Sequence, residues 1–211
     1  MDFLRVEFDI QHHLVLSKKN RRDHALIRMI VSTLSTPGEL ANLSKRDFRF
    51  KKTKSFDYYT VRLSEGGRSR ISPVDRKTYE IIQSLPAKPF DLTWKEMDEI
   101  VAKYSPLDVR YTCVKLREAV KSILSDSAFF GEIEDIKDID RKYAFMIDFN
   151  PLYTGFWDLE EEDGIEDFVL SYAEINKIKD SKKIASETGI DEVIVREILE
   201  SGKRSILAFK N

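Results

Sequence analysis

The clearest hydrophobic pattern in the chain lies between Arg22 and Leu43. Apolar side chains recur there at the three- and four-residue spacing of a helix and form a stripe too broad for a surface helix, at Ala25, Leu26, Ile27, Met29, Ile30, Val31 and Leu34. This predicts a largely buried helix at about 22–35. Thr36-Pro37-Gly38 should end it, because proline disfavours helical backbone at the preceding residue and glycine permits a turn. A second, short helix is expected at about 38–44.

A period of two residues replaces the helical period after this corner. Tyr59, Val61 and Leu63 share one face of the segment, and Thr60 and Arg62 lie on the other. Two consecutive glycines follow, as in a tight hairpin turn. We therefore predict a β-hairpin over 57–72.

Helical spacing returns at 75–84 and 93–103, and a longer helix is predicted to open at Ser105-Pro106 and to continue to Ile123. The segment Asp2–Leu16 fits either a strand or a short helix. The expected fold is mostly α with a small antiparallel hairpin or sheet. The expected domains are 1–160 and a C-terminal module at 161–211.

Composition narrows the class of protein. Apolar residues make up 42% and charged residues 34% of the chain, as in ordinary globular proteins, and no run is long and apolar enough to span a bilayer. The acidic, amphipathic N-terminus does not suit a signal peptide, and Cys113 is the single cysteine, so we expect a cytoplasmic protein without an intrachain disulfide. Three histidines make a structural zinc site improbable, and no metal or cofactor is predicted.

Charge is distributed unevenly along the chain. Residues 21–90 carry 15 Lys and Arg against 7 Asp and Glu, whereas residues 131–170 carry 3 against 13. A basic block of this kind can bind DNA by releasing counterions from phosphates, although a solvated charged face would look the same in sequence. The acidic segment 131–170 is a candidate to fold back and cover the basic face.

The order of these motifs resembles the catalytic domain of tyrosine recombinases, also called phage-type integrases. The resemblance spans roughly residues 20–148 and rests on four segments: RDHALI at 22–27, GEL at 38–40, SEGGRSRISPV at 64–74 and SPLDVRYT at 105–112. It implies the recombinase catalytic fold. In that family two arginines and a histidine bind the scissile phosphate, a lysine donates a proton and a tyrosine attacks.

Most catalytic positions that the resemblance implies are replaced in this sequence. Thr36 stands for the first arginine, Glu65 for the hairpin lysine and Leu107 for the histidine. The second arginine corresponds to Arg110, and Tyr143 lies where the nucleophile is expected.

Losing these groups should abolish cleavage. One preorganised donor is typically worth about 10²–10³ in rate, and Glu65 would repel phosphate as well as failing to act as an acid. The main hypothesis is therefore a protein that binds double-stranded DNA without cutting it, in regulation or as an accessory to recombination. The residues expected to contact DNA are Lys45, Arg46, Arg62, Arg68, Arg70 and Arg110.

The C-terminus carries a second motif, over 180–201. Ala185 and Gly189 occupy the small-residue and turn positions of a helix-turn-helix, and apolar residues follow at matching spacing. Arg196 would lie on the recognition helix among carboxylates that repel DNA, so a structural or protein-binding role is at least as reasonable.

Two rival functions remain open at the sequence level. The first is an active recombinase with a rearranged site that uses Arg110 and Tyr143. The second is a protein-interaction or oligomerisation module, in which the C-terminal helices bind a partner or a second copy.

Overall fold

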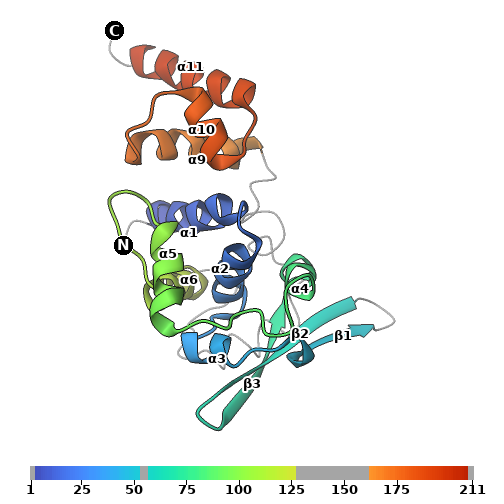
Figure 1. The fold of residues 1–211 in the computed structure, drawn as a ribbon. Helices are drawn as coiled ribbons and strands as arrows, with labels where there is room; N and C mark the ends of the chain where they lie inside the picture. Colours follow the sequence, from blue (N-terminus) through green and yellow to red (C-terminus); the bar gives the residue numbers. More distant parts are fainter. Residues whose placement is uncertain (1–2, 53–56, 127–161, 209–211) are drawn as a thin grey trace.

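The computed structural model describes residues 3–52, 57–126 and 162–208, and its fold is mostly helical with one small sheet (Figure 1). The predicted mostly α architecture with a small antiparallel sheet is confirmed at that level. In chain order the elements are α1 (Phe3–Ser17), α2 (Arg21–Thr33), α3 (Pro37–Ala41), the 3-10 helix η1 (Lys45–Asp47), β1 (Phe48–Lys52), β2 (Asp57–Glu65), β3 (Arg68–Val74), α4 (Arg76–Gln83), α5 (Trp94–Lys103), α6 (Cys113–Asp126), α9 (Glu162–Ile175), α10 (Ser181–Thr188) and α11 (Glu192–Ala208).

The predicted buried helix forms as α2 and lies at the centre of the main core. Every residue from Asp23 to Thr33 is buried, and the Asn20 side chain caps the helix by accepting from the Asp23 amide. The helix ends at Leu34, whose left-handed backbone lets its amide donate to the Ile30 carbonyl. This sharp stop produces the predicted corner, and α3 begins only three residues later.

The N-terminal segment, which the sequence left open between strand and helix, is the helix α1. Two opposite sides of this helix are buried, each in a different apolar cluster. Val6, Ile10 and Leu14 join the main core, whereas Phe8 and Val15 pack against the C-terminal helices. Because two opposite faces are apolar, no single stripe marks this helix in the sequence.

The predicted hairpin forms as β2 and β3, joined by Gly66 and Gly67, which both have positive φ angles. β1 adds a third antiparallel strand, which the sequence did not predict, in the order β1-β2-β3. The inner face of the sheet is buried against the core, with Phe48, Val61, Leu63 and Val74. The outer face carries Arg49, Thr60, Arg62 and Ile71, as the strand register requires.

The helix predicted from Ser105-Pro106 begins later than expected, at Cys113. Tertiary contacts hold 105–112 in an irregular conformation. Ser105 Oγ accepts from the Tyr111 amide at 2.9 Å, and the Tyr111 hydroxyl donates to buried Asp9 of α1 at 2.7 Å. These bonds give the Tyr111 amide and hydroxyl their partners without a helix. The periodicity of the sequence does not reveal such bonds.

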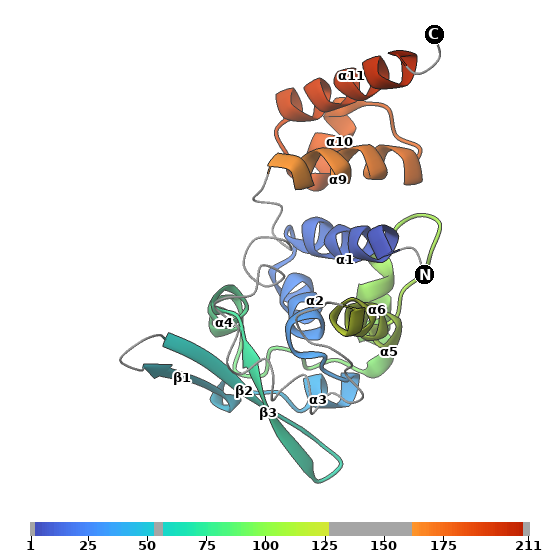
Figure 2. The same cartoon turned by 180° about the vertical axis from the view of Figure 1, so that it is seen from behind.

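The three C-terminal helices lie on α1, at the end of the molecule opposite the β2–β3 hairpin (Figures 1 and 2). Phe168, Tyr172, Ile184 and Val195 form a second apolar cluster with α1. In the described parts of the chain, no helix is long and apolar enough to cross a membrane.

Candidate nucleic-acid interface

The corner between α2 and α3 brings two of the predicted site positions into contact. Thr36 caps α3 reciprocally with Glu39: its hydroxyl accepts from the Glu39 amide, and its own amide donates to the Glu39 carboxylate at 2.9 Å. The same hydroxyl donates at 2.5 Å to Oε2 of Glu65, which is the last residue of β2. The structure therefore brings Thr36 and Glu65 together, two of the positions that the resemblance assigns to one site.

Gly38 makes room for this contact. A Cβ atom built at Gly38 would lie 1.8 Å from Glu65 Oε1, so any side chain there would displace the carboxylate. Two carboxylates, from Glu39 and Glu65, consequently line the corner. Carboxylates at this position disfavour the approach of a phosphate.

Arg70 is held inside this corner. Its guanidinium donates to both Glu39 oxygens, at 2.7 and 3.0 Å, and to the Thr33 carbonyl at 2.9 Å. Only 18% of the Arg70 side chain and 10% of the Glu39 side chain are exposed. This geometry uses Arg70 to join β3 to the end of α2, and does not fit the DNA contact predicted for it.

The other predicted cations divide into engaged and exposed groups. Lys45 donates to the Gln83 carbonyl at 2.6 Å and is half-buried. Arg46 and Arg62 are exposed on the outer side of the sheet. Arg49, which was not predicted, is exposed beside them, and its guanidinium donates to the Arg46 and Phe48 carbonyls. We call these three residues the basic sheet face. They surround a shallow hollow of about 90 Å³, lined also by Asp47, Thr60 and Ile71.

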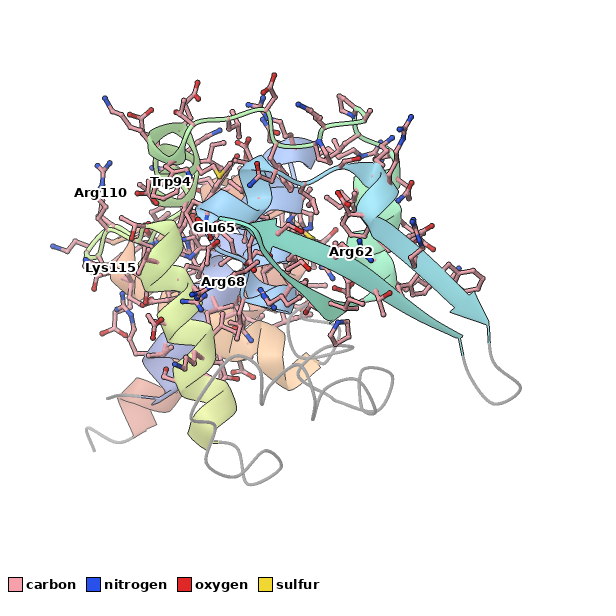
Figure 3. The ribbon with its side chains drawn as sticks, turned by 90° about the horizontal axis from the view of Figure 1, so that it is seen from below. Arg62, Glu65, Arg68, Trp94, Arg110 and Lys115 are labelled. Carbon is pink, nitrogen blue, oxygen red and sulfur yellow. The ribbon has the colours of Figure 1, made fainter. Side chains whose placement is uncertain are left out.

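Arg68 lies at the tip of the hairpin, exposed, directly opposite Glu65 in the register (Figure 3). Within the described residues, neither Arg62 nor Arg68 forms an ion pair with an acidic side chain. Asp47 lines the same hollow as the three arginines, and its carboxylate accepts from the Ser44 amide at 2.8 Å.

Leu107 and Arg110 do not reach the corner. Both lie in the irregular segment before α6, where Leu107 is 69% exposed, and Figure 3 shows Arg110 pointing away from Glu65 and Arg68. Arg117 of α6 lies there instead, and its Nε donates to the Leu34 carbonyl at 2.8 Å. The sequence analysis did not single out Arg117. Val114 and Arg117 have the same three-residue spacing as Leu107 and Arg110, so the motif could also have been placed there.

Two predicted features fall outside the described residues. These are Tyr143 and most of the acidic segment, over 131–161. No geometry therefore bears on the nucleophile position or on coverage of the basic sheet face by that segment.

The C-terminal helices form the predicted pair joined by a tight turn. Gly189 ends α10 in a left-handed conformation, and its amide donates to the Ala185 carbonyl at 2.8 Å. Arg196 is exposed on α11, as are Glu197 and Glu200. This helix pair lies at the end of the molecule opposite the hairpin, so one contact surface cannot include both (Figure 1).

A buried polar network on α1 was not visible in the sequence. His12 Nδ1 lies 2.9 Å from the Tyr104 carbonyl, its ring stacks on Tyr172, and His13 Nδ1 lies 2.6 Å from the Asp9 carbonyl. Burial lowers the pKa of both histidines to about 4. Burial also raises the pKa of Asp9, against the opposing hydrogen bond from Tyr111.

The described residues contain no cluster of three or more histidine, cysteine or acidic side chains suited to a metal ion. The basic sheet face offers exposed guanidinium groups, which can bind phosphates or carboxylates.

Comparison with known proteins places the chain next to an archaeal relative. No family model matches the sequence, and no solved structure matches it. Over 210 residues the chain is 63% identical to an uncharacterized protein of Archaeoglobus fulgidus, and the match covers all of this chain and 99% of the relative. The chain therefore belongs to the same protein family as this Archaeoglobus protein.

Proposed function

We propose that this protein binds double-stranded DNA through the basic sheet face, with Arg68 at the hairpin tip, and does not cleave it. The observation that carries the proposal is the exposure of Arg46, Arg49 and Arg62 around one hollow on the outer side of the sheet. A strand ribbon with outward arginines can follow a phosphate backbone without reading bases.

Electrostatics supports this assignment of the sheet. Each arginine that neutralises a phosphate releases a condensed counterion, and the slope of log K against log salt changes by about −0.9 per contact. Arg62 and Arg68 have no acidic partner among the described residues, so binding would not first require an ion pair to break.

The proposed absence of cleavage follows from the resemblance to tyrosine recombinases. At the position of that family's first arginine stands Thr36, whose hydroxyl is hydrogen-bonded to Glu65. Glu65 replaces the proton-donating lysine with an acceptor. Arg117 is a better candidate than Arg110 for the second arginine, because it reaches the end of α2 at Leu34.

Fluorescence anisotropy with a labelled duplex, at several salt concentrations between roughly 50 and 200 mM, tests the proposal. We expect micromolar or tighter binding at low salt that weakens steeply as salt rises. Arg62→Ala should weaken binding and reduce the salt slope by about 1, equally for unrelated sequences. Glu65→Gln should strengthen binding several-fold, because it removes a negative charge beside Arg68.

Arg76→Ala is the matched control. It also removes one positive charge, but Arg76 lies on α4, on the other side of the sheet, with its Nε 2.7 Å from Glu80. Equal losses in Arg62→Ala and Arg76→Ala, or a flat salt dependence, would contradict the assignment.

The rival hypothesis of an active recombinase has its own test. If the protein were an active recombinase, a suicide DNA substrate would trap a covalent adduct with the wild-type chain. That adduct would disappear in Tyr143→Phe and in Arg117→Ala. We expect no adduct.

A further inference from the structure

The exposed face of α11 is acidic and apolar, which is unusual for the second helix of a helix-turn-helix. Val193 and Ile194 are 49% and 43% exposed, and Asp191, Glu197 and Glu200 are exposed beside them. Arg196 is the one exposed cation in this set. Carboxylates at the front of this helix repel phosphates, so the surface suits a basic protein partner better than DNA.

The basic sheet face has the complementary composition. Arg46, Arg49 and Arg62 surround Ile71, which is 61% exposed. Exposed apolar side chains within a charged rim are typical of protein contact sites. Each surface thus has an apolar centre, and the charges around the two centres are opposite in balance. Three arginines and Asp47 surround Ile71, whereas Asp191, Glu197 and Glu200 outnumber Arg196 on the α11 side.

We propose that the α11 face of one copy docks on the basic sheet face of a second copy. The two surfaces lie at opposite ends of the molecule in both views, with α1 and α2 between them, so they cannot meet within one chain (Figures 1 and 2). The contact is therefore head-to-tail, and an open assembly keeps one free surface of each kind at its ends.

The size of the contact sets its strength. Stable interfaces bury roughly 800 Å² on each partner, and two turns of helix against three short strands offer less than this. We expect a reversible association that depends on protein concentration and is suppressed at about 0.5 M salt, where exposed charges are screened. DNA bound at the sheet would compete with it; the self-association itself does not depend on the proposed DNA binding.

Sedimentation velocity on the full chain, at low salt and over a wide range of protein concentrations, tests the proposal. Wild type should shift from monomer to larger species as concentration rises. Reversal of the acidic face (Glu197→Lys with Glu200→Lys) and reversal of the basic face (Arg46→Glu with Arg62→Glu) should each remain monomeric alone. A mixture of the two variants should associate, because each retains the wild-type surface that the other lost.

Glu166→Lys with Glu174→Lys, on exposed positions of α9, changes the net charge equally and should associate like wild type. Circular dichroism checks that each variant is folded. A wild-type monomer at every concentration, or association that survives reversal of the basic face, would overturn the proposal. Labelled DNA whose binding depends on Arg196 rather than on Arg62 would also overturn it, because α11 would then be a DNA-binding surface.

Discussion

Arg62 and Arg70 lie on neighbouring strands of one sheet but have different roles, because their side chains have different surroundings. Arg70 on β3 is enclosed by the Glu39 carboxylate and the carbonyls at the end of α2, whereas Arg62 on β2 faces solvent. The two lie on opposite faces because Arg62 pairs with Ile71 in the register, one step away from the pair of Leu63 with Arg70.

This difference predicts opposite outcomes for two alanine substitutions. Arg70→Ala leaves Glu39 buried and unpaired and should lower the free energy of unfolding by roughly 3 kcal/mol. Arg62→Ala should change it by no more than about 0.5 kcal/mol, as for other exposed positions. Urea denaturation followed by circular dichroism measures both. Similar stability losses in the two variants would show that Arg62 is not free at the surface.

Residue-scale prediction from sequence succeeded where it depended on local order along the chain. The helix stop at Thr36-Pro37-Gly38 and the glycine turn after Glu65 placed these two side chains at the ends of their elements. The family resemblance assigned both residues to one candidate site, and only the structure shows that their side chains are hydrogen-bonded. The hydrogen bonds of Arg70 and Arg117 could not be predicted from the sequence. Both side chains bind carbonyl groups at the end of α2, which lies far from them in the chain.

At the scale of elements, the β2–β3 turn determines how the hairpin presents Arg68. Gly66 and Gly67 have φ values of +57° and +76°, so the two-residue loop has positive φ at both positions, as in a type I′ turn. No atom lies within 4 Å of a Cβ built at either glycine. Only backbone conformation therefore limits substitution here.

Two substitutions separate backbone conformation from packing. Gly66→Asn should be tolerated, because Asn-Gly is a preferred pair in type I′ turns. Gly67→Val should cost about 1–2 kcal/mol, because a β-branched residue strongly disfavours positive φ. Thermal unfolding by circular dichroism gives the comparison. Equal melting temperatures for the two variants would exclude a type I′ turn in solution.

Sequence periodicity identified α2 by its broad apolar stripe, α4 and α5 by one buried face each, and the hairpin by its alternation. It left α1, which is buried on two sides, open between strand and helix, and it wrongly predicted a helix over 105–112. In that segment helical spacing continues, but Tyr111 and Ser105 make tertiary bonds that replace the helical ones. Local pattern is a weak guide when another element supplies the hydrogen-bond partners.

At the scale of the whole molecule, α1 connects the main core to the C-terminal helices. Phe8 packs on Phe168, with ring centroids 5.5 Å apart, while His12 lies between Tyr104 of the main body and Tyr172 of α9. Disturbing α1 should therefore affect both parts together.

The buried histidines give a pH test of this connection. The pKa of each is about 4 in the folded protein and 6.5 in the unfolded chain. Above pH 6.5 both states are neutral and the stability is fully present. As pH falls from 6.5 towards 4, the unfolded chain takes up protons first, so each histidine should cost up to about 3 kcal/mol of stability.

Urea denaturation between pH 7 and 4.5 measures this loss. His12→Gln should show a smaller decrease with pH than wild type, because one of the two titrating groups is gone. Asp9 acts in the opposite sense, since burial raises its pKa, but it is unchanged in the comparison. A wild-type stability that stays constant down to pH 5 would contradict the burial of these rings.

The sequence by itself determined the fold class, the central helix with its sharp corner, the glycine-turn hairpin and the paired C-terminal helices. These features follow from hydrophobic period, capping and turn residues, which act over a few positions. Only the tertiary structure decided which predicted cations are engaged, since Arg70 and Lys45 bind distant groups whereas Arg46 and Arg62 are exposed. It also decided that Arg117, not Arg110, reaches the corner, and that the basic and acidic surfaces lie at opposite ends. The physical reason is that partners and directions in space depend on residues far apart in the chain.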